Sequence, residues 1–270
     1  MNAKRLYIGN GVFAVLILVA TILFSIGFLP KYFIKTFDSA LFVLCGVFNI
    51  IMLYKIKGGL GLKPWFMLIG LIFAFIGDVL LIEPDLFLLG AIFFAIGHIF
   101  FLVYFYMLQK FNWLDIIISV VLFVTALLIL LLYPSFNFGD LKIVVIIYAL
   151  IITFMLGKAL SNFICKRNIP NLITFIGAFL FFFSDVMLVF YVFGNMPAIF
   201  DTLCLLTYYP AEFLLAISII LQGTKEEVFE VKPSPAKPNN DLNKEDAVTV
   251  LKEDDFVDNT KTEDNQDNNN

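Results

Sequence analysis

Long apolar stretches separated by short polar connections dominate the first 222 residues of the chain. A helix needs about 20 mostly apolar residues to cross a bilayer, and eight stretches approach or reach that length. We therefore predict eight transmembrane helices, over Leu6–Leu29, Ser39–Tyr54, Pro64–Ile82, Leu86–Leu108, Leu114–Tyr133, Ile143–Leu160, Pro170–Phe193 and Ile199–Gln222. Turn residues such as Pro30, Gly58 and Gly194 lie between them.

Two of these stretches match each other without a gap at a separation of 107 residues. Ile69–Leu81 contains Asp78, and Ile176–Leu188 contains Asp185 at the same place. The two segments belong to the third and seventh predicted helices, which are four helices apart and therefore run in the same direction. The sequence predicts an all-α polytopic membrane protein built as two parallel four-helix halves.

Composition supports a membrane protein and separates the C-terminal part from the rest. The chain is 61% hydrophobic, contains 33 Phe and has a mean hydropathy of +0.94, far from the average of soluble domains. Its net charge of −4 divides into −7 from Thr224 onward and +3 before it. We expect a transmembrane domain over residues 1–222 and an acidic, Asn-rich disordered tail over residues 223–270. We expect no nucleic-acid partner.

Basic residues predict the orientation of the eight helices. Nine Lys or Arg residues fall on the side of the N-terminus and three on the other. Cytosolic loops carry the excess of Lys and Arg, so we expect both termini in the cytosol.

Asp78 and Asp185 are the strongest candidates for a functional site. A carboxylate in hydrocarbon costs several kcal/mol, and an intramembrane Asp therefore indicates function by default. Equivalent places in a repeat strengthen that interpretation, although a buried Asp can also lock helix packing. Asp115 and Asp201 lie at the ends of predicted helices, where we expect them to be solvated.

Further polar groups lie at a similar depth in other predicted helices. His98 lies in the fourth, and Tyr208, Tyr209 and Glu212 lie in the eighth. Each of them could also be an ordinary packing residue. His98 is the only histidine and the three cysteines are scattered, so we expect no metal and no cofactor.

At these residues the chain resembles the YhhN-like family, the lysoplasmalogenases. Four short motifs, in the same order over residues 5–222, carry the resemblance: Gly77-Asp78-x-Leu80-Leu81, Gly97-His98, Ser184-Asp185-x-x-Leu188, and Tyr208-Tyr209-x-Ala211 followed by Glu212. The family pattern has Gln where Glu212 stands. Lys35 fits the basic residue that precedes the second helix of the family.

The resemblance implies hydrolysis of the vinyl ether bond of lysoplasmalogens, which gives a fatty aldehyde and glycerophosphocholine or glycerophosphoethanolamine. It implies catalytic roles for Asp78 and Asp185 and a location in the endoplasmic reticulum membrane. The residues implied to contact the lysophospholipid are His98, Ser184, Tyr208, Tyr209, Glu212 and Lys35.

The chemistry of the reaction suits two carboxyl groups. A vinyl ether cleaves when an acid protonates its β-carbon, and the oxocarbenium-like cation is then captured by water, a demand that paired carboxylates meet in glycosidases. Intramembrane acids also mark proton-linked transporters, which we keep as the alternative. The sequence does not decide whether the chain forms a homodimer.

Overall fold

The computed structural model of the protein describes residues 3–25, 28 and 30–229. These residues form eight α-helices and two short 3₁₀ helices, with no strand among them. The α-helices are α1 (Ala3–Ser25), α2 (Lys31–Lys57), α3 (Lys63–Leu80), α4 (Phe87–Leu108), α5 (Trp113–Leu132), α6 (Lys142–Cys165), α7 (Ile169–Phe193) and α8 (Ile199–Phe229), with η1 (Pro84–Leu86) before α4 and η2 (Gly139–Leu141) before α6.

Each of the eight α-helices contains a segment that is long and apolar enough to cross a membrane. The predicted all-α architecture with eight spans is therefore confirmed. Helix α8 continues to Phe229, beyond the apolar stretch that the sequence predicts. Most of the predicted acidic tail, residues 230–270, lies outside the described residues.

Helix α2 differs most from its prediction because it begins at Lys31 rather than at Ser39. Lys35 and Asp38 interrupt the apolar run, yet they are only 8% and 0% exposed. They belong to the helix and face the interior of the bundle. The helix ends at Lys57, three residues after the predicted end of the span at Tyr54. Gly58 follows it with a φ of 69° and donates its N–H to the Tyr54 carbonyl at 2.8 Å, a common helix C-terminus.

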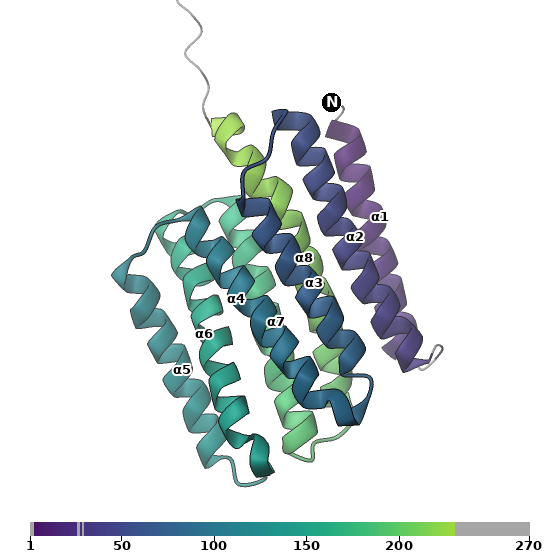
Figure 1. Ribbon diagram of the computed structural model, residues 1–270, viewed down its shortest axis with the longest axis vertical. Helices are drawn as coiled ribbons and strands as arrows, with labels where there is room; N and C mark the ends of the chain where they lie inside the picture. Colours follow the sequence, from purple (N-terminus) through teal and green to yellow (C-terminus); the bar gives the residue numbers. More distant parts are fainter. Residues whose placement is uncertain (1–2, 26–27, 29, 230–270) are drawn as a thin grey trace, which may run out of the picture. The chain divides into compact units, whose positions relative to one another are not determined.

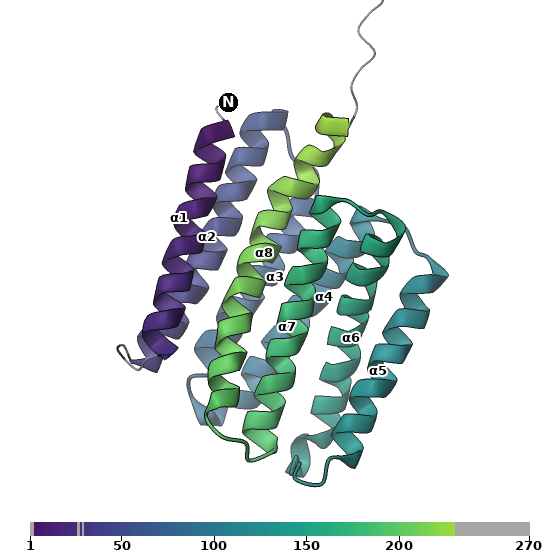
Figure 2. The same cartoon turned by 180° about the vertical axis from the view of Figure 1, so that it is seen from behind.

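The helices pack as two related halves (Figures 1 and 2). Helices α3 and α4 lie on one side and α7 and α8 on the other, with α2 and α6 at the two edges between them. Helix α1 packs outside α2, and α5 packs outside α6. These two outer helices bury the smallest shares of their apolar spans, 17% and 11%. They are the first helices of the two predicted halves, so the outer positions repeat as well.

Two glycines 107 residues apart bring the Asp-bearing helices close to their neighbours. A Cβ at Gly70 would lie 2.3 Å from the Phe101 ring of α4, and one at Gly177 would lie 3.2 Å from the Ala211 carbonyl oxygen of α8. Small residues allow such close approach between membrane helices. Repeat-equivalent glycines thus allow close approach of each Asp-bearing helix to the helix that follows it, α4 for α3 and α8 for α7.

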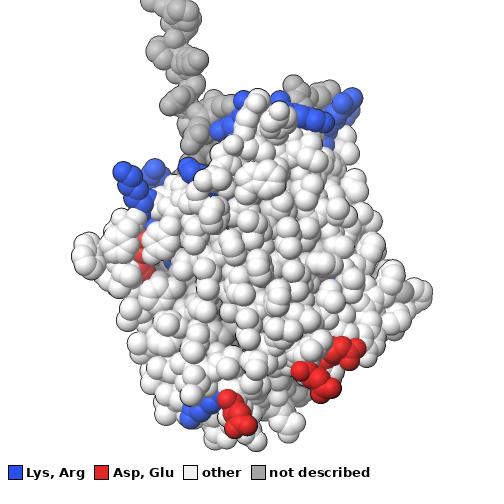
Figure 3. Space-filling model, viewed as in Figure 1, with Lys and Arg blue, Asp and Glu red and all other residues white. Residues whose placement is uncertain are grey.

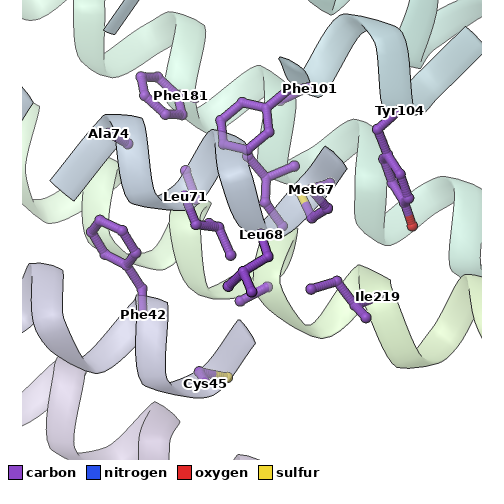
Figure 4. Close-up of a cluster of buried hydrophobic side chains, with 14 of the residues drawn as sticks. Phe42, Cys45, Met67, Leu68, Leu71, Ala74, Phe101, Tyr104, Phe181 and Ile219 are labelled. Atoms are coloured by element: carbon purple, nitrogen blue, oxygen red, sulfur yellow. The ribbon is translucent and has the colours of Figure 1, made fainter. Parts of the chain in front are cut away.

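The centre of the bundle is a closely packed apolar core (Figure 4). Phe42, Leu71, Phe101 and Phe181, from four different helices, have no exposed surface. Lipid tails are as apolar as this core, so helix association in a bilayer depends on close packing and on polar contacts. Polar side chains inside such a core consequently need an explanation.

Charged side chains divide between the two ends of the bundle. On the face drawn in Figure 3, Lys and Arg gather at the end where α1 begins and α8 ends, and most acidic residues lie at the opposite end. The start of α1 and the end of α8 lie on the same side, as an even number of spans requires.

Candidate active site

A pocket of about 870 Å³, part of it open to the outside, enters the bundle from the end opposite the start of α1. Leu81, Phe87, Leu141 and Phe193, which lie at the ends of their helices or just beside them, line its outer part. The walls are mainly apolar. The polar and charged residues that line the pocket are Lys35, Asp78, Tyr148, Ser184, Asp185, Asp201, Cys204 and Tyr208.

Asp78 lies in the last turn of α3 and is 3% exposed. Its Oδ2 atom accepts a hydrogen bond from Tyr208 Oη of α8 at 2.7 Å and lies 2.5 Å from Ser39 Oγ of α2. The same Ser39 hydroxyl contacts the Lys35 carbonyl oxygen, also at 2.5 Å. Lys35 lies near enough for its charge to act on Asp78.

Asp185 lies in α7 and its side chain is 13% exposed. Its Oδ2 atom accepts a hydrogen bond from Tyr148 Oη of α6 at 2.7 Å and lies 3.3 Å from His98 Nε2 of α4. His98 Nε2 also lies 2.9 Å from Tyr148 Oη. The three side chains therefore contact one another around a single carboxyl oxygen.

The two halves of the protein hold each other's carboxyl groups. Asp78 is contacted by α2 of its own half and by α8 of the other, whereas Asp185 is contacted by α6 of its own half and by α4 of the other. The neighbours occupy equivalent helices but differ in chemistry. A serine and a tyrosine hold Asp78, while a tyrosine and an imidazole hold Asp185. Equivalent helices therefore contact the two carboxyl groups, but the side chains that make the contacts differ.

Most of the residues that the sequence singled out come together here. Lys35, Asp78, Ser184, Asp185 and Tyr208 line the pocket. Ser184 Oγ lies 3.3 Å from Cys204 Sγ, which also borders the pocket. His98 has no exposed surface and contacts Asp185 from inside the bundle.

Tyr209 and Glu212 do not line the pocket, and both have no exposed surface. Neither the Tyr209 hydroxyl nor either oxygen of Glu212 forms a hydrogen bond of standard geometry with a described residue. Tyr209 lies beside Ser39, and Glu212 lies beside Tyr208. Successive residues of a helix point about 100° apart, which is why Tyr208 faces the pocket and its neighbour does not. The lining of the pocket gives no support to their predicted contact with substrate.

Two residues of the site carry no signal that sequence reasoning could use. Tyr148 is a single tyrosine in an apolar helix, and its repeat equivalent is Leu41. Ser39 only marks the start of the second predicted apolar stretch. Both are recognised as site residues because they contact Asp185 and Asp78.

Asp115 is not solvated as predicted, because it is 1% exposed. Its Oδ2 atom lies 2.8 Å from Lys158 Nζ and accepts the Asn112 N–H at the start of α5. Asp115 is buried although it lies at a span end, because it caps the N-terminus of α5 and pairs with Lys158 of the neighbouring helix α6. Asp201, the other aspartate expected at the surface, lines the pocket and is partly buried.

The geometry defines a polytopic helical membrane protein with two carboxyl groups at an apolar pocket. Among the described residues, no three His, Cys, Asp or Glu side chains are grouped as a metal site. The sequence profile of the YhhN family matches residues 50–219, more than half of the chain. The protein belongs to the YhhN family. No curated protein and no solved structure matches the chain.

Proposed function

We propose that the protein is a membrane hydrolase that cleaves the vinyl ether bond of lysoplasmalogens to a fatty aldehyde and glycerophosphocholine or glycerophosphoethanolamine. The observation that carries the proposal is that Asp78 and Asp185 line one apolar pocket. Carboxyl groups are rare in membrane spans because placing them in hydrocarbon is energetically costly, and those that occur usually have a function. Membership of the YhhN family supports the same reaction class.

The pocket suits a single-chain lipid with an anionic headgroup. Its apolar walls would hold the alkenyl chain, and Lys35 offers a cation for the phosphate. The vinyl ether lies close to the headgroup in such a lipid, so it would reach the polar part of the pocket, where Ser184 and Tyr208 could bond the glycerol.

The reaction needs one acid and one base in sequence. One carboxyl gives its proton to the β-carbon, and the π electrons of the double bond form the new C–H bond. The α-carbon then carries an oxocarbenium charge that the second, ionised carboxylate stabilises and that water attacks, with loss of a proton to that carboxylate. The hemiacetal breaks its carbon–oxygen bond to give aldehyde and alcohol, as in other two-carboxyl hydrolyses of acetal-type bonds.

The proposal includes a membrane location and orientation. An endoplasmic reticulum protein with both termini in the cytosol would open this pocket to the lumen, because the pocket enters from the end opposite the start of α1. A homodimer remains compatible with the lipid-facing outer helices α1 and α5.

The experiment is to measure aldehyde release by the purified full chain in detergent from 1-alkenyl-glycerophosphocholine and 1-alkenyl-glycerophosphoethanolamine. The matched control substrate is the 1-alkyl ether, which has no double bond to protonate and should give no product. A well-folded protein that releases no aldehyde from either alkenyl lipid would refute the proposal. Gradient-dependent uptake into proteoliposomes without hydrolysis would favour the transporter instead.

A further inference from the structure

Tyr148 is the centre of the hydrogen bonds around Asp185. Its hydroxyl lies 2.7 Å from Asp185 Oδ2 and 2.9 Å from His98 Nε2, and its side chain lines the pocket. A phenol has one proton to donate and can accept in return. The Tyr148 hydroxyl therefore links the His98 imidazole to the Asp185 carboxyl group.

Counting protons around Asp185 favours an ionised carboxylate. If His98 Nε2 carries the ring proton, it donates to Tyr148 at 2.9 Å and Tyr148 donates to Asp185 at 2.7 Å, so each of these two shorter contacts contains one proton. The third contact, 3.3 Å from His98 Nε2 to Asp185 Oδ2, is long enough to share the imidazole proton. The reverse chain would start from a protonated Asp185 and would need the imidazole proton on Nδ1. That atom is buried and has no partner among the described residues, and a buried N–H without an acceptor is costly.

Counting protons around Asp78 gives the opposite result. Ser39 Oγ lies 2.5 Å from the Lys35 carbonyl oxygen and 2.5 Å from Asp78 Oδ2. Both contacts are shorter than the usual O–H···O distance of about 2.7–2.8 Å, too short for one hydroxyl proton to be shared between them, and the serine has only one proton. The carbonyl can only accept, so the serine donates to it, and the second proton belongs to Asp78. Tyr208 donates to the same Oδ2 atom, which a protonated carboxyl oxygen still allows.

We infer that Asp78 is the proton donor of the reaction, that Asp185 is the ionised carboxylate, and that Tyr148 is a positioning residue that keeps Asp185 in that state. This inference rests on the proposed hydrolase function. Tyr148 extends the site beyond the residues that the sequence singled out.

The assignment lets both carboxyl groups return to their starting states in one turnover. Rotation of the Asp78 carboxyl about Cβ–Cγ turns its proton toward the β-carbon, and the resulting anion is stabilised by Lys35 and Tyr208. Asp185 takes a proton from the attacking water as the hemiacetal forms. It returns that proton to the leaving glycerol oxygen, while the hemiacetal hydroxyl proton goes to Asp78.

The test is infrared difference spectroscopy on the full-length protein in detergent, which reads carboxyl protonation without any substrate. Asp78→Asn should remove a carboxylic-acid C=O band, and Asp185→Asn should remove a carboxylate band. Tyr148→Phe should shift the Asp185 carboxylate band. The matched control is Tyr104→Phe, a buried tyrosine outside the pocket whose hydroxyl contacts the Ser218 carbonyl at 3.4 Å, and it should change neither band. Loss of the carboxylate band in Asp78→Asn and of the carboxylic-acid band in Asp185→Asn would overturn the assignment.

Kinetics provide the second readout. Tyr148→Phe should lower kcat/KM by about 5- to 150-fold, the loss expected for one hydrogen bond to a charged group, whereas Tyr104→Phe should stay within about 3-fold of wild type. An inactive wild type with the expected bands would refute the hydrolase and leave the protonation assignment standing. An active wild type with unchanged Tyr148→Phe bands and rate would refute the role of Tyr148.

Discussion

The two ends of the bundle both bury charged side chains, but they treat them differently. At the end where α1 begins, Lys158 Nζ is 2.8 Å from Asp115, 3.0 Å from the Lys110 carbonyl oxygen and 4.5 Å from the Tyr106 ring centroid. The charge of the lysine is fully matched there. At the other end, Asp78 and Asp185 line a pocket, where hydroxyl groups and an imidazole contact their carboxyl groups.

This difference separates structural from functional polar groups in a membrane interior. The Asp115–Lys158 pair is enclosed in the bundle and does not line the pocket, so it stabilises one packing arrangement and is not accessible to a ligand. Carboxyl groups that keep an oxygen toward a pocket forgo part of that stabilisation, which indicates chemistry. The comparison predicts that substitutions at the pocket end reduce activity, whereas substitutions at the other end reduce stability.

The largest effect on turnover should come from Asp78→Asn and Asp185→Asn. Asparagine keeps the shape and most hydrogen bonds of aspartate but loses the acid and the charge. General acid–base catalysis contributes about 10²- to 10⁴-fold to the rate, so the kcat of each variant should fall by at least about 100-fold. The yield of monodisperse protein should equal that of wild type. Aldehyde release from an alkenyl lysolipid at equal protein concentration measures the loss. If both variants kept more than about a tenth of wild-type kcat, a barrier change under 1.4 kcal/mol, the carboxyl groups would be structural.

Lys158→Met should have the converse effect. It leaves Asp115 as a buried charge without its cation, and breaking a buried pair in this way costs about 3–5 kcal/mol of stability. Thermal unfolding in detergent should show a large decrease in Tm, and the folded fraction should keep its kcat. The double variant Lys158→Met with Asp115→Asn removes the lone charge and should recover part of the Tm. A loss of kcat at unchanged Tm would contradict the division between the two ends.

Much of the fold could be predicted from the sequence because each membrane helix corresponds to a long apolar run. The eight spans follow from that pattern, and the match of Ile69–Leu81 to Ile176–Leu188 follows from comparing the sequence with itself. The start of α2 could not be predicted, since Lys35 and Asp38 read as a polar connection until the other helices cover them. Burial in a bundle is a property of the neighbours, which a single helix does not encode.

The site residues that occur at equivalent positions in both halves could be predicted from the sequence, whereas those that contact a site residue only in the folded protein could not. Asp78 and Asp185 share a position in two halves, so the sequence alone brings them together. Tyr148 and Ser39 have no repeat equivalents of the same type, and only the packing of α6 against α7 and of α2 against α3 gives them a role. Tyr209 is adjacent to Tyr208 in sequence, but the helical turn points it away from the pocket. Glu212 lies one turn after Tyr208 along α8, beyond the residues that line the pocket.

Smaller effects should distinguish two neighbouring tyrosines of α8. Tyr208→Phe removes the hydrogen bond to Asp78 and should cost about 1–3 kcal/mol, or about 5- to 150-fold in kcat/KM. Tyr209→Phe removes a buried hydroxyl that forms no hydrogen bond of standard geometry with a described residue, so it should leave kcat/KM within about 3-fold of wild type and Tm equal or slightly higher. Equal losses in the two variants would show that Tyr209 also takes part in the site.

His98→Gln tests whether the imidazole positions Asp185 or transfers protons. We expect a loss similar to that of Tyr208→Phe, about 5- to 150-fold in kcat/KM, because an amide can still donate to Tyr148. The pH profile of kcat/KM between about pH 5 and 9 should keep its shape. A variant as inactive as the Asp variants, with one limb of the profile missing, would make His98 the acid or base.

The smallest effect should come from deleting residues 230–270. The deletion leaves α8 complete to Phe229 and touches none of the residues that line the pocket. From Thr224 onward the sequence is acidic, with a charge of −7, and such composition does not supply the apolar surface that docking into a membrane bundle requires. The pocket also enters from the end opposite the start of α1, whereas α8 ends on the same side as that start. A truncated protein of wild-type Tm should therefore keep its kcat and KM for the alkenyl lipid. Loss of turnover in that folded truncation would show that the acidic segment completes or gates the site, and the division between a catalytic end and a structural end would then be wrong.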